Sequence, residues 1–136
     1  MKLLKNLLLL SMVVILTSFT NNVESKPVQT YYAFIIAAEH DKRFDEPGNN
    51  GYVDLTSDIV SYNCNKSDTA IKYQFIEHYN AQEANDNRSL AFNASTTSAW
   101  IYNTYDEAVA SRREWMATKQ TSKRKRTIKN FYITCN

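Results

Sequence analysis

The fold is decided by residues 31–38, which read YYAFIIAA. Eight residues is the length of a strand, and aromatic and β-branched side chains favour strands over helices. No polar residue interrupts the run, so the side chains on both faces of such a strand are apolar. A strand of this kind is typical of the centre of a sheet whose two faces are both covered. We therefore expect residues 31–38 to form a central strand.

A polar loop and a second strand are predicted after this stretch. The loop, 39–51, ends in PGNNG, in which proline fixes φ and glycine and asparagine accept positive φ. Loosely alternating apolar residues then predict a strand over 52–62, which the polar residues 56–58 interrupt. We expect the two strands to pair antiparallel across a long loop.

Two segments show the spacing of amphipathic helices. In the first, over 68–84, apolar residues recur every four positions from Ile71. Alternation over 71–75 leaves a strand as the rival interpretation of that segment. The second helix, 104–119, begins with TYDE, which has the threonine and glutamate of a capping box.

Three shorter segments complete the predicted fold. Residues 98–103 and 128–134 have strand length and composition, and 90–92 is a candidate for a short edge strand. The predicted order is β-β-α-β-α-β. This order favours the α+β class, as a small two-layer sandwich with a mainly antiparallel sheet of about four strands and two helices on one face.

Residues 1–25 have the layout of a cleaved secretory signal peptide. Two lysines near the start precede an almost wholly apolar segment over 7–19. That segment is shorter than the about 20 residues that a membrane anchor needs, although an uncleaved anchor is the rival interpretation. Cleavage fits best after Ser25 and less well after Thr20. We expect one secreted or periplasmic domain over 26–136, with no membrane span after cleavage.

The compartment decides how the two cysteines are interpreted. Outside a reducing cytosol, Cys64 and Cys135 are expected to form one disulfide. A bond that closes so long a loop contributes roughly 4 kcal/mol in the chain-entropy model, and it ties down the C-terminus. A redox-active pair lacks the Cys-x-x-Cys spacing, and two free thiols are the remaining alternative.

Charge is distributed unevenly along the chain. Residues 26–111 carry 6 basic and 12 acidic side chains, whereas residues 112–136 carry 8 basic and 1 acidic. Four consecutive cations are candidates for binding an acidic polymer, a phosphate backbone or a membrane surface. These are Lys123, Arg124, Lys125 and Arg126. The plainer interpretation is a solvated loop, and a sharper one places this basic segment against Asp54, Asp58 or the acidic loop 41–46.

The two histidines are the weak candidates for catalysis. His40 and His78 each follow a glutamate, and imidazoles with nearby carboxylates such as Glu77 can act as acid and base or bind a metal. Their spacing matches no metal-binding motif, so we predict no metal site. Solvated histidines at the edge of the domain are the simpler interpretation.

Glycine occurs only at positions 48 and 51, which excludes the familiar glycine-rich motifs. The chain contains no nucleophile elbow, no P-loop and no dinucleotide fingerprint, so we expect no nucleotide or other cofactor. Six aromatic residues are candidates for a sugar-binding platform, although such residues more often belong to the core of a small domain. These residues are Tyr31, Tyr32, Trp100, Tyr102, Tyr105 and Trp115.

Two functional hypotheses follow from these patterns. The favoured one is a small secreted or periplasmic, non-enzymatic binding protein whose partner is a macromolecule, either a protein or an acidic polymer. It depends on size, the expected disulfide, the uneven charge and the lack of a catalytic motif. The alternative is a small secreted hydrolase or metal-dependent enzyme that uses His40 and His78, which requires these two residues to converge.

Overall fold

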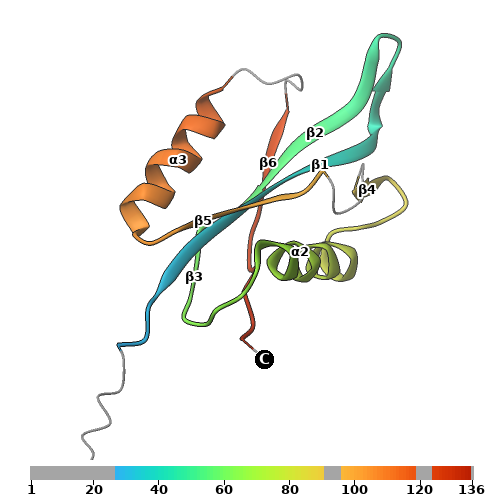
Figure 1. Ribbon diagram of the computed structural model, residues 1–136. Coiled ribbons are helices and arrows are strands. Elements are labelled where there is room, and N and C mark those ends of the chain that lie inside the picture. Colours follow the sequence, from blue (N-terminus) through green and yellow to red (C-terminus); the bar gives the residue numbers. More distant parts are fainter. Residues whose placement is uncertain (1–26, 91–95, 119–123, 136) are drawn as a thin grey trace, which may run out of the picture.

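A long central strand organises the computed structural model, which describes residues 27–90, 96–118 and 124–135. Strand β1 (Tyr31–Glu46) contains the apolar stretch and pairs with four other strands. The prediction of a central strand is therefore confirmed. The α+β class is also confirmed, with two helices and a mostly antiparallel six-stranded sheet (Figure 1).

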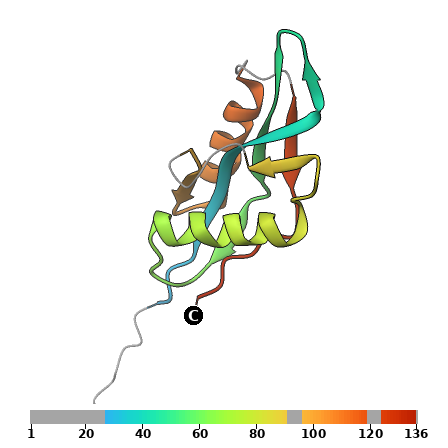
Figure 2. The same ribbon diagram turned by 90° about the vertical axis from the view of Figure 1, so that its right-hand side faces the viewer.

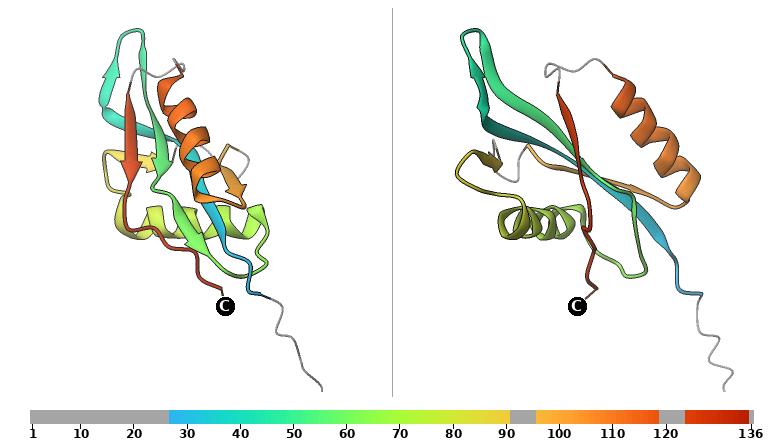
Figure 3. Two further views of the ribbon diagram at one scale, coloured as in Figure 1. Left: turned by 90° about the vertical axis from the view of Figure 1, so that its left-hand side faces the viewer. Right: turned by 180° about the vertical axis from the view of Figure 1, so that it is seen from behind.

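The pairing registers place the other strands on the two edges of β1. One edge pairs with β2 (Asn49–Ser57) and β3 (Val60–Tyr62), and the other pairs with β4 (Arg88–Leu90) and β5 (Ser98–Tyr102). All four strands are antiparallel to β1. Strand β6 (Lys125–Ile128) runs parallel to β2 on its far side. Among the described strands, β4 and β5 thus form one margin of the sheet, and β6 and β3 lie at the other (Figures 2 and 3).

The two helices cover opposite faces of this sheet, so the fold has three layers. Helix α2 (Asp68–Gln82) packs on the face that contains Ala33 and Ile35, whereas α3 (Tyr105–Ala117) lies over the face that contains Phe34 (Figure 1). The expected two-layer arrangement with both helices on one face is therefore wrong. The reason lies in β1 itself, because a strand that is apolar on both faces needs cover on both.

The main core lies between α2 and the sheet. Ile71, Phe75 and Tyr79 of α2 are fully buried and recur every four residues, as expected for the inner face of a helix. They pack on inward-facing residues of β1, β2 and β6 and on the C-terminal tail. The helix predicted over 68–84 is confirmed, and the strand alternative over 71–75 is wrong.

Helix α3 begins as its sequence predicts. The Thr104 hydroxyl accepts a hydrogen bond from the Glu107 amide at 3.3 Å, and the Glu107 carboxylate accepts one from the Thr104 amide at 3.2 Å. This reciprocal pair is the predicted capping box. Only Ala108 and Trp115 of α3 are buried, so α3 is packed less extensively than α2.

The polar segment after residue 38 continues β1 instead of forming the expected loop. β1 extends to Glu46, and the turn Pro47-Gly48 leads directly into β2, with Gly48 at φ +85°. The register between the two strands shifts within this hairpin, which marks a bulge. Gly51 lies at the bulge with φ +65°, and a side chain there would collide with Asp45. Backbone pairing therefore extends the strand although its side chains are polar.

Two other predicted strands differ in outcome. The strand expected over 52–62 is indeed interrupted, since β2 ends at Ser57 and β3 begins at Val60. The strand expected over 128–134 is wrong, because β6 ends at Ile128 and the tail after it forms no strand. The basic side chains of β6 give no apolar strand pattern, so the sequence predicts a solvated loop where the strand forms.

The C-terminal tail is held against α2 by a side-chain amide. Gln74 of α2 donates a hydrogen bond to the Thr134 carbonyl and accepts one from the Thr134 amide, both at 3.0 Å. The Phe131 ring packs edge-on against Phe75, with 5.4 Å between centroids. Gln74 therefore supplies the hydrogen bonds that a neighbouring strand would have provided.

The predicted disulfide is confirmed. Cys64 and Cys135 are bonded, with their Cα atoms 5.8 Å apart and a sequence separation of 71. Disulfides persist in oxidising compartments, so the bond is consistent with an extracytoplasmic location. The predicted signal peptide, 1–25, lies outside the described residues. Within the described ranges, no helix is long and apolar enough to cross a membrane.

Candidate interaction surfaces

His40 lies in the β1–β2 hairpin and has a carboxylate partner. Its Nε2 is 3.0 Å from Asp45 Oδ1, and its ring packs edge-on against Tyr52 at 5.8 Å between centroids. It follows Glu39, whose side chain faces α2, so His40 projects to the opposite face of the sheet. The shift of register at the bulge brings the side chains of His40 and Asp45 within reach of each other.

His78 lies on α2, on the other side of the sheet. Its ring packs against Phe131 at 5.7 Å between centroids, and its Nε2 is buried without a hydrogen-bond partner. Glu77 is exposed on the same helix. The structure therefore does not bring His40 and His78 together. Among the described residues, no group of three or more histidine, cysteine, aspartate or glutamate side chains is arranged to hold a metal.

The basic segment is used inside the fold, beginning with Arg126. Its guanidinium forms ion pairs with the fully buried Glu39 and, at 2.6 Å, with Glu83. Burial opposes the charge, but the hydrogen bonds that the guanidinium donates to these two carboxylates outweigh it and raise the pKa of Arg126. Glu39 also accepts a hydrogen bond from the Tyr79 hydroxyl, and burial together with this bond raises the pKa of Tyr79. This network joins β1, α2 and β6.

Two neighbouring cations also have internal contacts. The Lys125 ammonium donates hydrogen bonds to three carbonyls at the end of α3, those of Trp115, Met116 and Thr118, and it lies 5.0 Å from the Trp115 ring. Cations at a helix C-terminus are stabilised by the helix dipole. The Arg124 guanidinium lies 4.2 Å from the centroid of the Phe44 ring. Lys123 lies outside the described residues.

These contacts favour the internal interpretation of the basic segment. Arg124 contacts the predicted loop 41–46 through Phe44, and its carbonyl accepts a hydrogen bond from the Asp54 amide at 3.0 Å. The carboxylates that pair with Arg126 are nevertheless different from the expected ones. Sequence reasoning missed Glu39 and Glu83 because both are distant from the segment in the chain, and only the parallel pairing of β6 with β2 brings them close.

A second ion pair stabilises the start of the hairpin. The Arg43 side chain donates to both carboxylate oxygens of Asp41, and its amide also donates to this carboxylate. These hydrogen bonds outweigh burial and lower the pKa of Asp41 to about 2. Asp41 therefore remains ionised in the fold.

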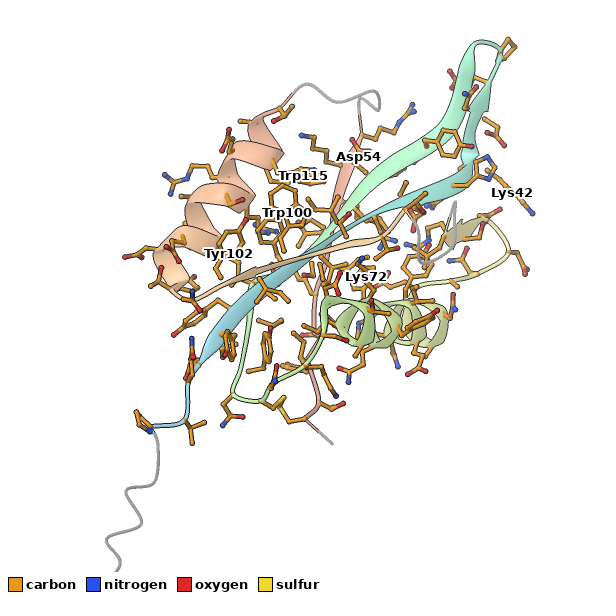
Figure 4. The ribbon with its side chains drawn as sticks, viewed as in Figure 1. Lys42, Asp54, Lys72, Trp100, Tyr102 and Trp115 are labelled. Carbon is orange, nitrogen blue, oxygen red and sulfur yellow. A yellow bond between two sulfur atoms is a disulfide. The ribbon has the colours of Figure 1, made fainter. Side chains whose placement is uncertain are left out.

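The six candidate aromatic residues do not form one platform. Tyr31 stacks on Tyr62 beside the α2 core, whereas Trp100 and Tyr102 stack on Phe34 on the α3 side. Figure 4 shows Trp100, Tyr102 and Trp115 together between α3 and the sheet. Trp115 is buried there, so aromatic residues mainly supply the second, smaller core. Two of the six remain substantially exposed, Trp100 at 44% and Tyr105 at 54%.

An open groove of about 350 Å³ runs beside α3. Four of its residues recur at helical spacing, which places them along one side of α3. They are Tyr105, Val109, Arg112 and Met116. Ile59, between β2 and β3, and Arg113 complete the lining. The groove is therefore lined by apolar side chains together with two guanidinium groups.

Arg112 is held in place at the groove. Its guanidinium donates to the Ser57 carbonyl at 2.9 Å and to the Thr127 hydroxyl at 3.2 Å, and it lies 3.7 Å from the Asp58 carboxylate. Arg113 is exposed. The sequence contains a signal for this surface, because Val109, Arg112 and Met116 share a helix face. Helical periodicity alone does not indicate whether that face packs inside or faces solvent.

The outer edge of β5 is a second candidate surface. One edge of β5 pairs with β1, and no described strand pairs with the other. Its sequence, SAWIY, carries no charge, and Trp100 and Ile101 are 44% and 36% exposed on opposite faces of the strand.

Comparison of the chain with protein-family models, curated proteins and solved structures finds no match.

Proposed function

We propose that this chain is a secreted or periplasmic, non-enzymatic binding protein, and that the α3 groove binds a segment of another protein. The observation that carries the proposal is the lining of the groove: exposed Tyr105 and Met116 lie beside Arg112 and Arg113. Apolar surface with aromatic, methionine and arginine side chains has the composition that is enriched in protein interfaces.

The chemistry of the lining defines the kind of partner. Apolar side chains of a bound segment would displace water from Tyr105, Val109 and Met116, and a carboxylate on the segment would pair with the Arg113 guanidinium. Arg112 is already oriented by Ser57 and Thr127, so little side-chain entropy is lost when a ligand contacts it. We therefore expect a partner segment that is both apolar and acidic.

The enzyme alternative has less support. It requires His40 and His78 to act together, and these side chains lie on opposite faces of the sheet. The basic segment also offers little to an acidic polymer, because Arg124, Lys125 and Arg126 make internal contacts. In the groove, by contrast, exposed apolar side chains lie beside the guanidinium groups of Arg112 and Arg113.

A peptide-display selection against the purified, disulfide-bonded protein tests the proposal. Enriched peptides should combine aromatic or aliphatic residues with aspartate or glutamate. Arg113→Glu should weaken their binding by about tenfold or more, because one charge pair becomes a repulsion. Lys129→Glu, which reverses an exposed charge outside the groove, is the matched control and should have little effect.

Two outcomes would overturn this assignment. One is that the selection enriches peptides no more strongly on the wild-type protein than on Met116→Lys, in which a charge occupies the groove. The other is equal weakening by Arg113→Glu and Lys129→Glu, which would indicate attraction by net charge alone.

A further inference from the structure

We propose that the outer edge of β5 pairs with the same strand of a second copy of this chain. The two strands would run antiparallel across a two-fold axis, so that one sheet continues through both copies. This proposal does not depend on the α3 groove, because Trp100 and Ile101 are not among the groove residues.

The unpaired edge of β5 is the first observation. In an antiparallel pair, a strand directs alternate backbone N–H and C=O groups to each side. The five residues of β5 use one side for β1, from Ser98 opposite Ile36 to Tyr102 opposite Tyr32. In Figure 1, β5 lies in front of β1, and Figure 2 shows it at the margin of the sheet opposite β6. The outward-facing groups thus form a template for another strand.

The contrast between the margins of the sheet is the second observation. The opposite margin, β6, carries Lys125 and Arg126, and β4 carries Arg88. Charged residues on edge strands oppose edge-to-edge pairing. β5 carries none, and Trp100 and Ile101 expose apolar surface on both of its faces. Compared with β4 and β6, β5 is therefore the strand whose side chains permit pairing.

The sequence of β5 favours a second copy as the occupant. Antiparallel self-pairing centred on Trp100 places this residue opposite its own copy. It also places the small Ser98 opposite Tyr102 and the small Ala99 opposite Ile101. On either side of the central Trp100 pair, a small side chain therefore faces a large one, and no like charges meet. An unrelated strand with small residues opposite Ser98 and Ala99 would leave gaps at these positions.

The interface is small, so the dimer should be weak and concentration-dependent. Sedimentation equilibrium of the purified, disulfide-bonded protein from about 10 μM to about 1 mM should show a monomer–dimer equilibrium in this range. Hydrogen exchange by mass spectrometry at both ends of the range should show that peptides covering 98–102 gain protection in the dimer.

Two variants make the test specific. Ile101→Lys should weaken dimerisation by at least about tenfold, because an ammonium would be placed beside apolar surface at the junction. Tyr132→Lys changes a 73% exposed residue of the tail and should leave dimerisation unchanged. Circular dichroism and the melting temperature check that both variants remain folded.

The proposal is supported only if peptides covering 98–102 gain protection in the dimer and Ile101→Lys also weakens dimerisation. A monomer over the whole range would overturn it. A dimer that forms without protection of 98–102, or that Ile101→Lys leaves intact, would also overturn it, since the copies would then meet elsewhere. Protection of 98–102 only when another protein is added would assign the edge to a different occupant.

Discussion

The two faces of the sheet differ in how they are covered. On the α2 face, three fully buried helix residues, the C-terminal tail, the disulfide and the Glu39–Arg126 ion pair all join elements that are distant in sequence. On the α3 face, Ala108 and Trp115 are the buried residues of the helix, and the groove beside it remains open. The difference indicates that one face provides most of the stability, and the groove that we propose for binding lies on the other.

The largest expected effect concerns the packing of α2. Phe75→Ala removes a fully buried ring between the sheet and Phe131, and it should lower the free energy of unfolding by about 3–5 kcal/mol. Met116→Ala, on the exposed side of α3, should change it by about 0.5 kcal/mol or less. Urea denaturation followed by fluorescence measures both. Equal losses would contradict the division of roles between the two faces.

A smaller loss in the free energy of unfolding is expected when one carboxylate is removed from the Glu39–Arg126 ion network. Glu39→Gln leaves the Arg126 guanidinium with one carboxylate partner, that of Glu83, and weakens the hydrogen bond from Tyr79. Removal of one partner from a buried ion pair costs about 3 kcal/mol, at the low end of the usual range because Glu83 remains. The Glu107→Gln variant, which changes an exposed carboxylate of α3, is the control, with a loss of about 0.5 kcal/mol or less. A Glu39→Gln protein as stable as the wild type would show that the network contributes no net stability.

Local sequence signals predicted the elements whose cause is local. The capping box at Thr104, the four-residue spacing from Ile71 and the turn at Pro47-Gly48 each depend on neighbouring residues. The disulfide was predictable because the chain has only two cysteines. For these features, the residues that form the contact lie close together in sequence or have no alternative partner.

Features that depend on distant pairing were not predictable in the same way. The apolar pattern of 31–38 predicts that both faces of the sheet are covered. Nothing in the sequence of either helix indicates which of these faces that helix covers. The strand at Lys125–Ile128 carries basic residues and forms only because β2 accepts it in parallel. Gln74 holds Thr134 from 60 positions away in the chain. The groove and the open β5 edge depend on which surfaces are left uncovered after these pairings form.

Native-state hydrogen exchange compares the two faces within one protein, because it measures the free energy of opening for each helix. We expect the amides of α2 around Phe75 to exchange only through global unfolding. We expect the amides of α3 around Val109 to exchange through a local opening of lower free energy. If α3 proved as protected as α2, or more so, the claim that the α2 face carries the stability and the α3 face is left for binding would be contradicted.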